Sequence, residues 1–177
     1  MATLSQPEKI EKLEFTFSDY VLGDLGFLFL AENTLPKIKD LTSFSIETGN
    51  TQLPGQVLRT LAQVNWKSWP HLEQLKLDIP EPSFEESDLG EFFTAVPNVK
   101  DLILGFGNSQ LTDQAIENFS TKILPTLDRL EKFEVGFWGT KPTHIGAANL
   151  LMNIAQNVKI LLIGLGRIEV TDDAVKP

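Results

Sequence analysis

One short apolar phrase recurs six times along the chain, and this recurrence constrains the fold more than any other feature. The last residues of successive phrases lie 27 to 31 positions apart. A period of roughly 20 to 50 residues predicts a repeat architecture, in which each unit buries its apolar face only against its neighbours. The phrases are Leu13-Glu14-Phe15, Phe44-Ser45-Ile46, Leu75-Lys76-Leu77, Leu102-Ile103-Leu104, Phe133-Glu134-Val135 and Leu161-Leu162-Ile163.

Each phrase belongs to a longer pattern that is typical of a half-buried β-strand. An apolar residue stands three positions before the phrase, and a further one follows two positions after it in most copies, with Thr48 as the exception. Apolar residues at every second position predict a strand with one buried face. The residues that open the six copies are Ile10, Leu41, Leu72, Val99, Leu130 and Val158.

The segments between the phrases change to a helical period. Between residues 111 and 123 the apolar residues form one stripe of a helix, which Thr112 is expected to cap and Asp113 to favour through the helix dipole. The same opening returns at Thr171-Asp172, at the same distance from the preceding phrase. Further helices are expected at about 23–32, 56–65, 84–95 and 144–155.

Prolines mark the return from four of the expected helices to the next strand, because proline cannot continue a helix. They stand at Pro36, Pro70, Pro97 and Pro125. Strands that alternate with helices through short connections predict a parallel sheet with helices on one face. The fold class expected from the sequence is therefore α/β.

Phrases of the form Leu-x-x-Leu-x-Leu with a helix in every unit resemble leucine-rich repeats, and the unit length resembles the ribonuclease-inhibitor-like subclass. The resemblance covers residues 10–175. It implies a solenoid, a right-handed α/β horseshoe segment with strands on the concave face and helices on the convex face. The family usually places Asn or Cys three positions after the last strand leucine. Here that position holds Ser18, Gly49, Pro80, Gly107, Trp138 and Gly166, so the turns must satisfy their backbone in another way.

We expect residues 1–177 to form a single leucine-rich-repeat domain of about five full repeats and part of a sixth. The sixth stops soon after its helix would begin. A solenoid needs a cap over its last apolar face. We therefore expect either a segment of a longer repeat protein or an incompletely capped end, covered by self-association or by a neighbouring subunit.

Composition excludes several classes of partner and of site. The formal net charge of −9 disfavours a nucleic-acid surface, and the absence of cysteine excludes disulfides and thiolate metal ligands. The N-terminus lacks the pattern of a secretory signal, and no apolar run is long enough to cross a membrane. These features predict a cytoplasmic protein that binds neither nucleic acid nor membrane.

No motif indicates catalysis, a metal or a cofactor. The two histidines, His71 and His144, do not stand at a metal-ligand spacing. The glycine pairs at 105/107 and 164/166 lack the third glycine of a dinucleotide-binding fingerprint. We therefore expect no enzyme, no cofactor and no metal site.

The expected concave face differs between its two halves. Its first half is charged and polar, whereas its second half combines exposed aliphatic residues with a row of glycines. Exposed apolar patches and glycines in strands often mark contact with a partner. The residues predicted to bind a partner are Ile103, Gly105, Glu134, Gly136, Trp138, Ile160, Leu162 and Gly164.

Other interpretations of these residues stay open at this point. In one alternative, the glycines accommodate tight turns where the strands end, and the protein's own chain covers Ile160 and Leu162. Trp138 would pack over the edge of the core instead of anchoring a partner, and Trp66 and Trp69 are expected to be core residues.

We expect this chain to be a protein–protein interaction module or scaffold that binds a protein partner through the concave strand face. An alternative is a regulatory protein that acts on an enzyme, as a GTPase activator or an enzyme inhibitor, as some relatives of this subclass do. Arg129 and Arg167 are the only basic candidates for that role in the later repeats. A third alternative is a purely structural spacer.

Overall fold

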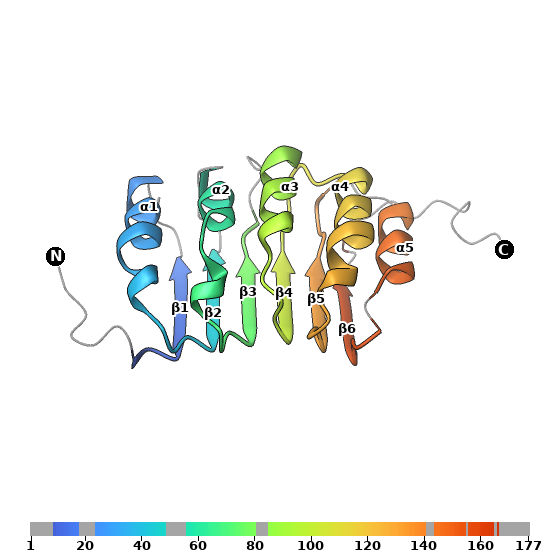
Figure 1. Cartoon of the computed structure of the whole chain (residues 1–177). Coiled ribbons are helices and arrows are strands. Elements are labelled where there is room, and N and C mark those ends of the chain that lie inside the picture. Colours follow the sequence, from blue (N-terminus) through green and yellow to red (C-terminus); the bar gives the residue numbers. More distant parts are fainter. Residues whose placement is uncertain are drawn as a thin grey trace.

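The computed structural model describes residues 9–17, 24–48, 56–80, 85–140, 144–154, 156–164 and 166 of the 177-residue chain. These residues form an α/β fold around one six-stranded sheet, in which every strand is parallel to its neighbour and the strands follow sequence order. In Figure 1 the strands stand side by side in one row, and the helices form a second row alongside it. The predicted α/β class and parallel sheet are confirmed.

The cross-strand register is the one that the recurring phrases predict. Phe15 pairs with Ile46, Ile46 with Leu77 and Leu77 with Leu104, and the same alignment continues to the last strand. Equivalent positions of successive units therefore form straight rows across the sheet. The strands are β1 (Lys12–Phe17), β2 (Ser43–Thr48), β3 (Gln74–Asp78), β4 (Asp101–Gly105), β5 (Lys132–Gly136) and β6 (Ile160–Gly164).

The predicted helical segments contain helices, although several end earlier than expected. Thr112 caps α4 as predicted, since its hydroxyl accepts a hydrogen bond of 3.3 Å from the amide of Ala115. The second Thr-Asp opening, at Thr171, lies outside the described residues. The helices are α1 (Asp24–Asn33), α2 (Gln56–Ala62), α3 (Glu86–Ala95), α4 (Asp113–Asn118) and α5 (His144–Met152).

The prediction of one regular helix through residue 123 was wrong in its second half. The chain continues from α4 as a π-helical turn over Phe119–Ile123 and a 3-10 turn over Leu124–Thr126. Pro125 has no amide hydrogen to donate, and its ring would crowd the carbonyl of Thr121 in a regular helix. The wider and tighter turns accommodate this proline and lead the chain to β5.

The core fills the space between the sheet and the helices. Its fully buried side chains include Phe44, Phe92, Phe106 and Phe133, all from strands or strand ends except Phe92 of α3. Aromatic rings contact one another along this core, for example Phe93 and Phe119 with centroids 4.6 Å apart. Burial of these apolar side chains is the main stabilising term of such a fold.

Trp66 and Trp69 lie in the core, as predicted. Their ring centroids are 5.6 Å apart in an edge-to-face arrangement. The indole nitrogen of Trp69 donates a buried hydrogen bond of 2.8 Å to the carbonyl oxygen of Ile38, 31 residues earlier. This bond ties two successive units together.

Backbone hydrogen bonds join the turns that follow the strands in neighbouring units. The amide of Asn108 donates to the carbonyl of Trp138 at 2.9 Å, and that of Gly139 donates to Gly166 at 3.3 Å. Asn108 and Gly139 both take positive φ values, 59° and 69°, which Asn and Gly tolerate best. The turns are thus satisfied by main-chain contacts from one unit to the next.

Candidate functional site

The described helices lie along one face of the sheet, and we call the other face the open face. It carries the strand residues that alternate with the buried ones. One row across β3 to β6 consists of Lys76, Ile103, Glu134 and Leu162, and the next row consists of Asp78, Gly105, Gly136 and Gly164. These rows arise directly from the register of the sheet.

A groove of about 450 Å³ lies on the open face over β3 to β6. Seven of the eight residues predicted to bind a partner line it: Ile103, Gly105, Glu134, Gly136, Trp138, Leu162 and Gly164. Ile160, the eighth, does not line the groove, but its side chain is 52% exposed on β6. The structure thus brings the predicted residues together, and partner binding stays a prediction.

The floor of the groove is a row of three glycines. Gly105, Gly136 and Gly164 are direct partners across three strands. A Cβ added to Gly164 would lie 3.5 Å from the Cα of Gly136. The neighbouring row across the sheet forms one wall of the groove. It consists of the half-exposed Leu162 and the partly exposed Ile103 and Glu134.

The packing of the protein itself explains why position 105 is a glycine. A Cβ at this position would overlap with the carboxylate of Asp78 on the neighbouring strand. The close approach that this glycine permits is therefore by a side chain of the same chain. The sequence places Asp78 on the open face, but it does not show that its carboxylate leans over β4.

Trp138 forms the other wall. It packs over the edge of the core and is also exposed to a partner, so both interpretations given for it apply in part. Its indole ring packs against Gly107, where an added Cβ would overlap with the ring, and Gly166 lies beside its Cβ. Nevertheless 43% of Trp138 is exposed. The side chain therefore covers the edge of the sheet and also offers an aromatic surface to the groove. Leu162 is 48% exposed, so the interpretation that the chain covers Ile160 and Leu162 is wrong.

The charges at the β3 side of the groove are not balanced. Lys76 pairs with Glu47, and this hydrogen bond raises the pKa of Lys76. Burial raises the pKa of Asp78, with Glu47 and Glu134 adding to the effect and Lys76 opposing it. Glu134 contacts Lys132 at 3.3 Å. Among the described residues Asp78 makes no ion pair, so its carboxylate remains available at the groove.

The remaining candidates lie away from this groove. Arg129 lies before β5, at the opposite end of the strands, and Arg167 lies outside the described residues. His71 is exposed, and His144 begins α5. Within the described ranges no group of three or more His, Asp or Glu residues is arranged to hold a metal ion.

No protein-family model matches the chain, and no curated protein matches it either. In the part of the chain that the structure describes, no helix has the length and apolar character needed to cross a membrane.

Proposed function

We propose that the chain is a short solenoid of leucine-rich-repeat type that binds a protein partner through its open, concave face. The observation that carries this proposal is the groove over β3 to β6, because exposed Leu162 and Trp138 stand on two sides of a floor of glycines. The constant register from unit to unit and the row of helices alongside the sheet support the solenoid. Exposed aromatic and aliphatic anchors around a concave surface are typical of protein-binding sites.

The dimensions of the groove suit an extended segment of a partner. Three gaps of about 4.8 Å separate β3 from β6, so the groove runs for roughly 14 Å across the sheet. A segment of about four extended residues covers that length at roughly 3.3 Å per residue. At Gly136 and Gly164 the floor permits the partner's backbone to approach the sheet closely.

The charges favour a partner segment with a basic side chain next to an apolar one. Asp78 is without an ion pair among the described residues, and the chain as a whole carries a net charge of −9. A lysine or arginine that reaches Asp78 would gain an ion pair, and its aliphatic stem would pack against Trp138. The overall negative charge would also accelerate the encounter with a basic partner.

The proposal is tested by co-purification from native lysate with matched variants. Leu162→Asp places a charge in the groove, and Leu151→Asp places the same charge on α5, where Leu151 is 52% exposed. Circular dichroism establishes that both variants are folded. We expect the Leu151 variant to retain a partner that the Leu162 variant loses. Equal recovery by the two variants would exclude the groove as the binding site.

A further inference from the structure

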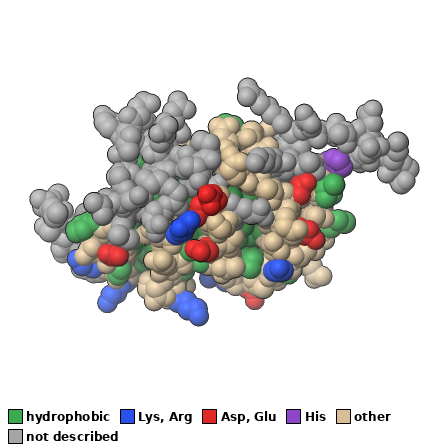
Figure 2. Space-filling model, turned by 90° about the horizontal axis from the view of Figure 1, so that it is seen from above, with side chains coloured by type: hydrophobic (Ala, Val, Ile, Leu, Met, Phe, Trp, Pro, Cys, Tyr) green, Lys and Arg blue, Asp and Glu red, His purple; other side chains and the backbone are tan. Residues whose placement is uncertain are grey.

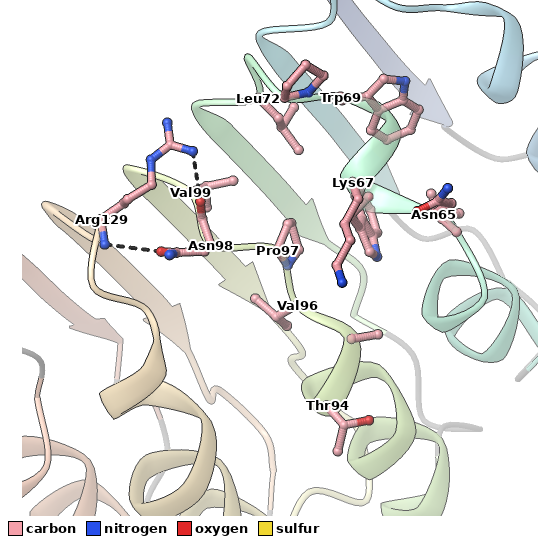
Figure 3. A pocket seen from close by; sticks show the side chains of 14 residues that line it. Asn65, Lys67, Trp69, Leu72, Thr94, Val96, Pro97, Asn98, Val99 and Arg129 are labelled. Carbon is pink, nitrogen blue, oxygen red and sulfur yellow. Dashed lines mark hydrogen bonds between the residues drawn. The ribbon is translucent and has the colours of Figure 1, made fainter.

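A second and larger cavity, of about 610 Å³, lies at the other end of the strands (Figure 3). It is built by the returns from helix to strand in three successive units: residues 64–72, residues 94–99 and Arg129. Its volume lies within the roughly 300 to 1,000 Å³ that is common for small-molecule sites. It shares no lining residue with the groove on the open face.

The cavity combines apolar walls with two basic side chains. Trp66, Trp69 and Val96 contribute to the walls, and Lys67 and Arg129 supply the charges. None of the described residues that line it is acidic. This differs from the upper surface in Figure 2, where acidic and basic side chains are interspersed. In a chain with a net charge of −9, an acid-free cavity with two cations is a local departure.

Arg129 is held at the rim of the cavity by Asn98. Its Nη1 donates to the carbonyl oxygen of Asn98 at 3.2 Å, and its backbone amide donates to the side-chain oxygen of Asn98 at 3.1 Å. Figure 3 shows both bonds as dashed lines and places Lys67 and Arg129 on opposite sides, with Pro97 and Asn98 between them. A positioned guanidinium loses less side-chain entropy when it binds an anion.

Neither cation is neutralised by a direct ion pair within the described part of the chain. The side chain of Lys67 makes no hydrogen bond or ion pair there. Glu73 interacts electrostatically with Arg129, but its carboxylate bonds to Lys100 at 2.7 Å. That hydrogen bond is the main reason why the pKa of Glu73 is lowered. Both cations thus keep donors for a ligand.

Trp66 lines the cavity and carries a buried indole nitrogen without a hydrogen-bond partner. Only 8% of Trp66 is exposed, and its buried Nε1 has no hydrogen-bond acceptor. The neighbouring Trp69 differs, since its Nε1 bonds to Ile38. Buried donors without an acceptor are uncommon and costly, so each one calls for a physical explanation.

We propose that this cavity binds a small organic anion. Its carboxylate or phosphate group would accept charge-assisted hydrogen bonds from Lys67 or Arg129, the two cations that line the cavity. Its aromatic or aliphatic body would pack against the walls that Trp66 and Val96 help to form. This site is independent of the proposed protein-binding groove, because it lies at the opposite ends of the strands.

The test is a titration of the isotope-labelled chain with phenylacetate, phenyl phosphate and neutral phenylethanol, followed by NMR. We expect an anion to bind more tightly than phenylethanol and to shift the indole N–H signal of Trp66. The comparison of phenylacetate with phenyl phosphate identifies the preferred acidic group. Signals of the three indole groups are assigned from single Trp→Phe variants.

Lys67→Gln combined with Arg129→Gln should weaken anion binding by about tenfold or more, because both charge-assisted contacts are lost. The control is Lys37→Gln combined with Lys39→Gln, which changes the net charge equally at an earlier return and should keep the affinity within about twofold. If the first double variant does not fold, Lys67→Gln alone carries the test. Equal weakening in the control, equally tight binding of phenylethanol, or no saturable binding of either anion would overturn the proposal.

Discussion

The indole ring of Trp138 packs on the backbone of Gly107, which belongs to the preceding unit of the sheet. Any Cβ at position 107 would overlap with this ring. The position of the aromatic wall of the groove therefore depends on the absence of a side chain at the turn beside it. This contact also explains how Trp138 is held in place while 43% of it stays exposed.

We predict that Gly107→Ala destabilises the protein by about 1 to 3 kcal/mol, the usual cost of overpacking. The displaced indole should also change the near-ultraviolet circular dichroism spectrum. Gly90→Ala is the matched control, because a Cβ at Gly90 in α3 meets nothing within 4 Å. That variant should be more stable than wild type by about 0.5 to 1 kcal/mol, since alanine favours a helix. Denaturant unfolding measures both, and a stabilised Gly107 variant would contradict the described packing.

Thr48→Val should raise the free energy of unfolding by about 1 kcal/mol. Thr48 is 3% exposed, and its hydroxyl has no hydrogen-bond partner. Other units place an apolar residue at the equivalent position. Removing a buried hydroxyl that lacks a partner relieves its desolvation cost, and valine has nearly the same shape. Thermal and denaturant unfolding test this, and a loss of stability would show that the hydroxyl has a partner in solution.

Trp69→Phe should destabilise the protein by about 2 to 4 kcal/mol. It leaves a void and removes the hydrogen bond of 2.8 Å to the buried carbonyl of Ile38. Trp66→Phe leaves a similar void, but the Nε1 that it removes has no acceptor. We therefore expect a smaller loss for Trp66→Phe under the same unfolding conditions. Equal losses would show that the bond to Ile38 contributes little to stability.

Asp78→Asn should stabilise the protein at neutral pH. Burial raises the pKa of Asp78 above its ordinary value, so ionisation of this carboxyl costs stability at any pH above its folded-state pKa. The cost disappears when the pH falls below the ordinary value, because Asp78 is then protonated in both states. The advantage of the variant should therefore shrink as the pH is lowered from neutral to about 3. An advantage that grows in acid would contradict the direction of the shift.

The strand order and register were predictable because they depend on periodicity alone. Alternation within each phrase fixes which side chains are buried, and the constant spacing aligns Leu77 with Leu104 and Val135. The same alignment placed seven of the eight candidate residues around one groove. Thr112 was predictable as a cap because the interaction is local.

Contacts between side chains of different units were not predictable. The position of Asp78 over Gly105 and that of Trp138 on Gly107 depend on side-chain directions across two strands. The cavity with Lys67 and Arg129 brings together residues about two units apart, and the sequence contains no motif for it. The irregular end of α4 also depends on how the chain accommodates Pro125, which marks a boundary but does not specify the turn type.

Site-specific photo-crosslinking tests whether a partner binds at the open-face groove. A benzophenone amino acid at position 162 places the probe in the groove, and the same residue at position 151 places it on α5. The probes are compared in lysate with the partner that co-purifies with the wild-type chain. We predict a crosslink to that partner from position 162 and none from position 151. A crosslink from position 151 alone would contradict the account and place the partner on the helical side.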